Sequence, residues 1–118
     1  MNSVEAALEA IYAVLETVAE VRLYRDPAAV VDPPGVTVGP PTLQRRARGS
    51  APTDATFQIA VVVSKNPRAM TELLRLEPLV VDAIDALPAG SVGDSAPGTW
   101  SSGGMDLPAY LIDFEYAL

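Results

Sequence analysis

The sequence contains no cysteine and no histidine, and these two absences remove much of the chemistry available to a small protein. Without cysteine there are no disulfides and no thiolate ligands for a metal ion. Without histidine, Ser–His and Cys–His nucleophilic mechanisms are impossible, and the commonest general acid or base near neutral pH is missing. The composition therefore argues against an enzyme, because only carboxylates, tyrosines, arginines and Lys65 remain for catalysis.

Positive charge is also scarce, with 8 basic residues against 15 acidic ones and a net charge of −7 in 118 residues. Nucleic-acid-binding modules gain affinity by neutralising phosphates, so an acidic chain is a poor candidate for one. No apolar run approaches the roughly 18 residues that a membrane-spanning helix needs. Glu5 and Glu9 do not suit a secretory signal. We expect a soluble protein made in a cytoplasm.

Hydrophobic residues make up 49% of the chain, and its length suits one domain spanning 1–118. From Val4 to Val18 apolar residues recur at alternating steps of four and three, which predicts an amphipathic helix. We expect this helix to start at a Ser3 cap and to end near Glu20. A second helical stripe starts at an Asn66 cap, where Pro78 predicts a kink or a division into two short helices.

Alternating or continuous apolar residues predict strands elsewhere. Residues 56–64 are apolar on both faces and predict a central strand, whereas 109–118 has an aromatic face and an acidic face. Residues 21–25 predict a short strand. Prolines enclose 36–38, which predicts either an edge strand or a strand bounded by tight turns, with 43–48 as its candidate partner.

Two segments have the composition of loops. Residues 45–55 are small and polar and predict an exposed loop. In 88–108, twelve of 21 positions are Gly, Pro or Ser, which predicts a loop-like segment with a weak strand at 98–102. The order of elements predicts an α+β fold, with a mainly antiparallel sheet of about four to six strands and two helices packed on one face.

Few residues in the sequence are candidates for a site. The carboxylate pairs Asp82/Asp85 and Asp113/Glu115 fit solvated faces of a helix and a strand. We therefore predict no catalytic, cofactor-binding or metal-binding residues. The cluster Arg45, Arg46 and Arg48 suits a solvated loop, contact with an acidic protein partner, or contact with a nucleic-acid backbone. Trp100 is the lone large apolar residue in its segment and suits a core or an interface.

Three stretches resemble the tail-terminator (tail-completion) proteins of long-tailed, siphovirus-type phages. They are the amphipathic opening helix, the proline-rich segment 32–41 (DPPGVTVGPP) and the ending 107–116 (LPAYLIDFEY). The strand 56–64, followed by the helix that starts at Asn66, fits the same order of elements. The chain departs from the pattern in its high Pro, Gly and Ala content and few lysines, which suits the high-GC genome of an actinobacterial phage.

The resemblance implies a structural virion protein that assembles with itself into a ring, typically a hexamer, on the end of the tail tube. There it would stop polymerisation of the major tail-tube protein and present a surface to the head-side connector protein. The implied location is the tail–neck junction of the virion, after assembly in the host cytoplasm, with transient DNA passage through the ring and no cofactor. Arg45, Arg46, Arg48 and Trp100 are the residues that we expect to contact partners.

Two other functions remain open at this point. The chain fits another neck subunit, such as a head-closure or head–tail joining protein, equally well. It also fits a small ligand-binding or regulatory α+β domain of a bacterium, which would need a concave pocket with converging polar groups.

Overall fold

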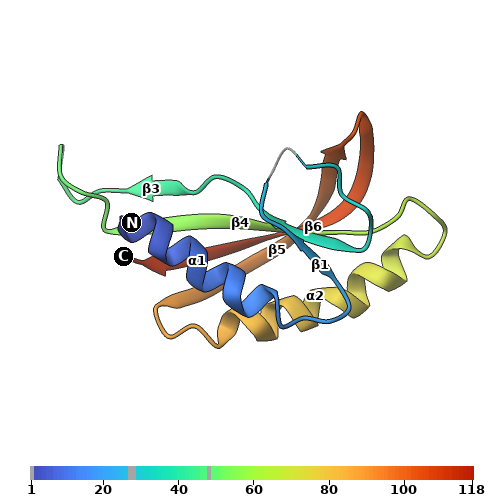
Figure 1. Ribbon diagram of the computed structural model, residues 1–118, viewed down its shortest axis with the longest axis horizontal. Helices are drawn as coiled ribbons and strands as arrows, with labels where there is room; N and C mark the ends of the chain where they lie inside the picture. Colours follow the sequence, from blue (N-terminus) through green and yellow to red (C-terminus); the bar gives the residue numbers. More distant parts are fainter. Residues whose placement is uncertain (1, 27–28, 48) are drawn as a thin grey trace.

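The computed structural model describes residues 2–26, 29–47 and 49–118, and within them the chain forms two helices and six strands (Figure 1). In chain order they are α1 (Ser3–Leu15), β1 (Arg22–Tyr24), β2 (Gly35–Val38), β3 (Thr42–Gln44), β4 (Asp54–Val62), α2 (Ala69–Asp85), β5 (Gly90–Ser102) and β6 (Met105–Ala117).

The six strands form one sheet, in which five strands follow one another in the order β1-β2-β4-β6-β5 and β3 is an additional partner of β4. The β1–β2 pair is parallel and every other pair is antiparallel. Strand β3 also pairs with β4, beside the first half of that strand, while β2 pairs with the second half. The predicted α+β fold and the central position of the strand within 56–64 are confirmed.

The opening helix differs at both ends from the sequence prediction. Asn2, rather than Ser3, is the N-cap, and its Oδ1 accepts a hydrogen bond from the Glu5 N–H at 2.8 Å. The helix ends at Leu15 instead of near Glu20, because Thr17 and Val18 continue the chain in tight turns with bonds to residues three positions back. Val18 is nevertheless buried, so the apolar residues from which the helix was predicted extend beyond its end at Leu15.

The proline-enclosed strand is interior. β2 lies between β1 and β4, so of the two alternatives the strand bounded by turns is correct and the edge strand is wrong. The predicted pairing of 43–48 with this strand is also wrong, because β3 pairs with β4 instead. The physical reason is the length of β4, whose nine residues accommodate two successive partners on one side.

Pro78 lies inside a single 17-residue helix, so the alternative of two short helices is wrong. Pro78 and Leu74 are both exposed. The Leu74 carbonyl, which would accept the hydrogen bond that proline cannot donate, therefore faces the solvent side of α2, where water can replace the missing donor. α2 begins at Ala69, after a turn in which Asn66 Oδ1 accepts a hydrogen bond from the Arg68 N–H.

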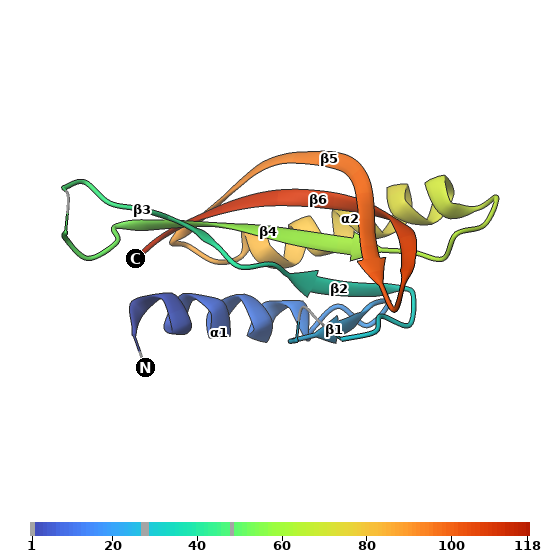
Figure 2. The ribbon, with the colours of Figure 1, turned by 90° about the horizontal axis from the view of Figure 1, so that it is seen from above.

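The weak strand predicted at 98–102 is confirmed, but the loop predicted for the rest of 88–108 is wrong, because most of it belongs to two paired 13-residue strands. Ser102 pairs with Met105, and the two residues between them, Gly103 and Gly104, have φ angles of +58° and +82°. Two consecutive residues with positive φ form the hairpin turn whose twist matches that of its strands. Figure 2 shows the β5–β6 pair bending along its length toward β1 and β2.

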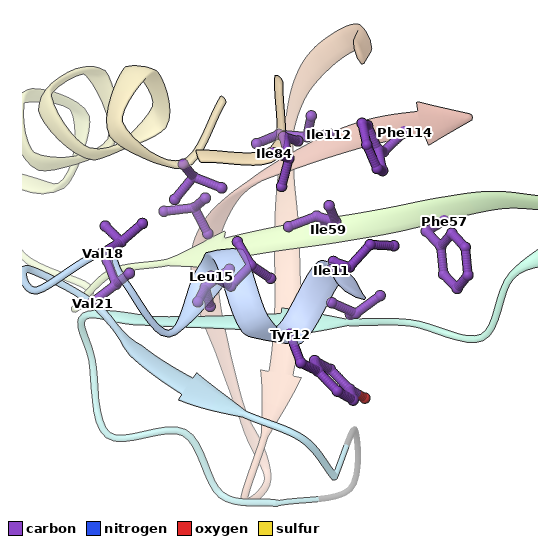
Figure 3. Close-up of a cluster of buried hydrophobic side chains, with 14 of the residues drawn as sticks. Ile11, Tyr12, Leu15, Val18, Val21, Phe57, Ile59, Ile84, Ile112 and Phe114 are labelled. Atoms are coloured by element: carbon purple, nitrogen blue, oxygen red, sulfur yellow. The ribbon is translucent and has the colours of Figure 1, made fainter. Parts of the chain in front are cut away.

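Both helices pack on one face of the sheet, as predicted. Ile11 and Leu15 of α1 meet Ile84 of α2 over Phe57 and Ile59 of the central strand (Figure 3). On the other face a smaller buried cluster, made of Val31, Ala60, Val62, Leu107 and Ala109, lies where the hairpin bends. The described elements thus enclose an apolar core on each face of the sheet. Neither described helix is long and apolar enough to cross a membrane.

Candidate interaction surface

The sheet has open borders on both sides. Strand β5 pairs with β6 on one side and, among the described residues, with nothing on the other. On the opposite side of the sheet, β1 and β3 are likewise paired on one side only within the described chain. Backbone N–H and C=O groups along such borders are available to another chain, which is why exposed strand edges mark interaction or aggregation sites.

The border of β5 has one irregularity in its register. The register shifts between Val92 and Ser95, which leaves Gly93 and Asp94 outside the ladder. Farther along, Pro97 lacks an N–H and limits continuous strand addition. The shift and the proline limit strand addition along 93–97. Gly90, Ser91 and Val92 precede this part of the edge, and within them the Gly90 N–H already donates to the Leu87 carbonyl at 3.1 Å.

The border of β3 is short and fully exposed. All three of its residues, Thr42, Leu43 and Gln44, are exposed to solvent. Arg45 and Arg46 follow directly and are exposed as well, and the Arg45 Nε–H donates to the Ser50 carbonyl at 3.0 Å. Two of the three predicted contact arginines thus lie beside an open strand edge. The third, Arg48, lies outside the described residues.

Trp100, the fourth predicted contact residue, lies elsewhere. It sits on β5 opposite Leu107, half-buried against the smaller cluster, near the turn of the hairpin. Its Nε1–H is buried and has no hydrogen-bond partner among the described residues. The structure does not bring Trp100 and the arginines together, because the hairpin turn lies far along the long axis from β3 and the loop that follows it (Figures 1 and 2).

The two carboxylate pairs lie on solvent-exposed faces, as the sequence predicts. Asp82 and Asp85 are exposed on α2, and Asp113 and Glu115 are exposed on the helix-free face of β6. None of the four takes part in an ion pair within the described chain. No group of three or more potential metal-ligating side chains occurs among the described residues.

The ion pairs of Arg25 connect the segment after β1 to α1, whereas Glu72–Arg75 lies within α2. The Arg25 guanidinium contacts Glu9 at 3.2 Å and Glu16 at 2.5 Å, and it lies 4.8 Å from the centre of the Tyr12 ring. Hydrogen bonds to Glu16 and then Glu9 raise the Arg25 pKa. On α2, the hydrogen bond from Arg75 lowers the pKa of Glu72. The charged side chains of these ion pairs are substantially exposed, so they stabilise local geometry rather than form a reactive site.

An apolar hollow lies near the hairpin turn. It has a volume of about 330 Å³ and is lined by Val30, Val31, Ser102, Met105 and Leu107 among others. The Val31 N–H donates to Ser102 Oγ at 2.6 Å, which holds the chain after β1 against the hairpin. Val30 and Met105 are 68% and 59% exposed. The lining is mostly apolar and includes Ser64, Lys65 and Ser102 as its only polar side chains among the described residues, which is few for orienting a small polar ligand.

The sequence pointed to the exposed arginines, which stay a prediction as contact residues, and it predicted only the last part of β5. The sequence signal for β5 is the pair Gly103-Gly104, which is typical of a two-residue hairpin turn and separates β5 from β6, two segments of equal length. Recognising that turn would have placed 90–102 beside 105–117 in spite of its glycines and serines.

Comparison with solved structures finds the bacteriophage SPP1 gp17 protein, at a TM-score of 0.58 and 13% sequence identity. The match covers 99% of this chain and 92% of that one, so it extends over the helices, the sheet and both borders. At this identity the similarity shows a shared fold. The chain has the fold of a bacteriophage protein. No protein-family model and no curated protein sequence matches it.

Proposed function

We propose that this chain is a structural protein of a tailed-phage particle, a subunit of a ring that caps the tail tube. In this role it ends polymerisation of the major tail-tube protein and joins the tail to the head-side connector protein. The observation that carries the proposal is the end-to-end similarity in fold to the bacteriophage SPP1 gp17 protein. The resemblance of the opening helix, the proline-rich segment and the C-terminal strand to tail terminators points the same way.

The architecture suits a subunit whose remaining surfaces serve assembly. Opposite borders of one sheet are open, and they differ in sequence and charge, so one can contact the other on a neighbouring copy. Contact between two different surfaces of the same chain produces a ring when the rotation closes. A ring built in this way has a defined number of subunits, and the resemblance to tail terminators favours six.

The net charge of −7 suits a ring through which DNA passes without being held. Stable binding to DNA requires basic groups that neutralise phosphates, and these are outnumbered here. A ring of acidic subunits repels the DNA backbone and leaves the passage free. The proposal therefore places Arg45 and Arg46 at protein contacts rather than at phosphates.

A polymerisation assay tests this function. A major tail-tube protein is allowed to polymerise with and without this chain, and tube lengths are measured by electron microscopy. We expect shorter tubes with one additional ring at an end when the chain is present, and unlimited growth without it. Tubes of equal length in both conditions, with no ring at either end, would show that the chain is not a terminator.

A further inference from the structure

We propose that the open edge of β3 in one copy pairs with the start of β5 in the next copy, so that one sheet continues from subunit to subunit. This inference rests on the proposed function and names the contact that builds its ring. The occupant of each border is a second copy of this chain, and the contact joins two different surfaces.

A row of paired residues, running across the sheet perpendicular to the strands, connects the open edge of β3 to the start of β5. Thr42 of β3 pairs with Thr56, which pairs with Glu115, which pairs with Ser91 of β5. The row therefore begins at one open border and ends at the other. When copies are related by rotation without displacement along the strands, Ser91 of one copy faces Thr42 of the next.

The adjacent row repeats this relationship on the other face of the sheet. Leu43 pairs with Ala55, Ala55 with Tyr116, and Tyr116 with Gly90. Continuation of this row sets Leu43 of one copy beside Gly90 of the next, on the face where the helices lie. Leu43 is an exposed apolar side chain at 36%, and this contact covers it. Both rows thus keep their own face across the boundary, as a continuous sheet requires.

Strand directions also agree. β3 is antiparallel to β4, β4 to β6, and β6 to β5. A neighbouring copy in the same orientation therefore presents β3 antiparallel to β5, the pairing that already holds throughout this part of the sheet. The segment Gly90–Val92 precedes the irregularity at Gly93, so its length matches the three residues of β3.

Charge favours contact between unlike borders. Beyond Gln44, Arg45 and Arg46 extend past the end of the sheet, at the level of the connection from α2 to β5. There α2 ends with exposed Asp85 and no basic residue in its last turn. The carboxylate and the negative end of the helix dipole form a binding surface for the arginines of the neighbouring copy.

The alternative of two β5 edges pairing with each other brings like charges together. In that arrangement the acidic ends of two α2 helices and the two Asp94 side chains share one interface. Such pairing also produces a closed dimer, which leaves the β3 edge unused. The same experiments separate the two arrangements.

A disulfide scan tests the register directly, because the natural chain has no cysteine to create a background. The double variant Thr42→Cys/Ser91→Cys is purified, oxidised in solution and on capped tubes, and analysed by denaturing electrophoresis. Within one chain the two positions are three strand spacings apart, about 14 Å, too far for an internal disulfide. We expect a ladder of covalent multiples that ends at the ring size.

A matched control uses the opposite face. In Leu43→Cys/Ser91→Cys, the first cysteine lies on the helix side of the sheet and the second on the helix-free side, so we expect little cross-linking. Equal ladders from both double variants, or from neither, would overturn the proposed register. A covalent dimer from Ser91→Cys alone would overturn it in favour of paired β5 edges.

Charge exchange provides the second measurement. Arg45→Glu/Arg46→Glu and Asp85→Arg should each raise the concentration for half-assembly by about tenfold, because attraction becomes repulsion at each contact. An equimolar mixture should restore assembly, since each variant then faces the opposite charge in an alternating ring. If the mixture assembles no better than either variant alone, the proposed contact between the arginines and Asp85 is wrong.

The outcomes separate this inference from the function on which it rests. If the natural chain caps tubes while the cysteine and charge variants behave like their controls, the β3–β5 contact is refuted and the terminator function stands. If the natural chain neither self-assembles nor caps tubes, the function fails and the contact fails with it.

Discussion

The ring of Phe114 occupies the space directly over Gly90, where the first atom of any side chain would lie. Gly90 begins β5 and pairs with Tyr116, and Phe114 is a fully buried core residue of β6. The position therefore accepts only glycine unless the aromatic ring moves. It links the core to the border at which we place the subunit contact.

Replacing Gly90 by alanine should destabilise the fold by about 1–3 kcal/mol, the usual cost of overpacking a buried site. Chemical denaturation measures the change in the free energy of unfolding. Gly39→Ala is the matched control, because a Cβ atom there meets the Gln58 carbonyl oxygen at an ordinary 3.7 Å. Equal stability of the two variants would show that Phe114 adapts without cost.

The hairpin turn depends on backbone conformation rather than on space. Gly104 has a φ angle of +82° and nothing near the position of a Cβ atom. Gly104→Val should lower stability by about 1–2 kcal/mol, because a β-branched residue is strained at positive φ. Gly104→Asn should lower stability by less, since asparagine tolerates a positive φ angle. Thermal unfolding of the two variants tests the order, and a valine variant as stable as the asparagine variant would contradict it.

The proline in α2 lowers the stability of the fold. Pro78→Ala should restore the hydrogen bond to the Leu74 carbonyl and raise the free energy of unfolding by about 1–3 kcal/mol, near the helix-interior penalty of proline. Both residues are exposed, so the substitution disturbs no core contact. The denaturation midpoint reports the gain, whereas a lower midpoint would mean that the proline fits a bend that the helix needs.

Tyr12 should make the stability of the fold depend on pH in the alkaline range. Burial raises the pKa of its phenol, and the O–H donates to the Arg25 carbonyl at 3.1 Å. A raised folded-state pKa gives stability that is complete below the unfolded value of about 10 and is lost as pH rises through the folded value. Tyr12→Phe should cost about 1 kcal/mol at neutral pH and should reduce the loss of stability above pH 10. Parallel pH curves for both proteins would contradict this account.

Much of the fold was predictable because its central elements have strong periodic signals. The apolar faces of β4 and β6 alternate over nine or more residues, and the stripes of α1 and α2 have helical spacing. The first part of strand β5, 90–97, was missed because glycine, serine and proline dominate it, so its side chains show no buried face. It forms a strand because β6 and the Gly103-Gly104 turn hold it in register.

The candidate contact surface could be predicted only in part. Arg45 and Arg46 stand out as a basic cluster in an acidic chain, and that local signal is correct about their exposure. Their proposed contact with Asp85 of a neighbouring copy depends on strand order, which arises from pairing between distant segments. The prediction for Trp100 rested on its isolation in a polar segment, and the structure places its ring against Leu107 and its neighbours.

The most direct test of the whole account is a three-dimensional map of the particle that carries this protein, at a resolution that separates strands. The account predicts a ring of copies at the junction of tail tube and neck, with β5 of each subunit beside β3 of the next. A particle whose junction density fits no copy of this fold would contradict it.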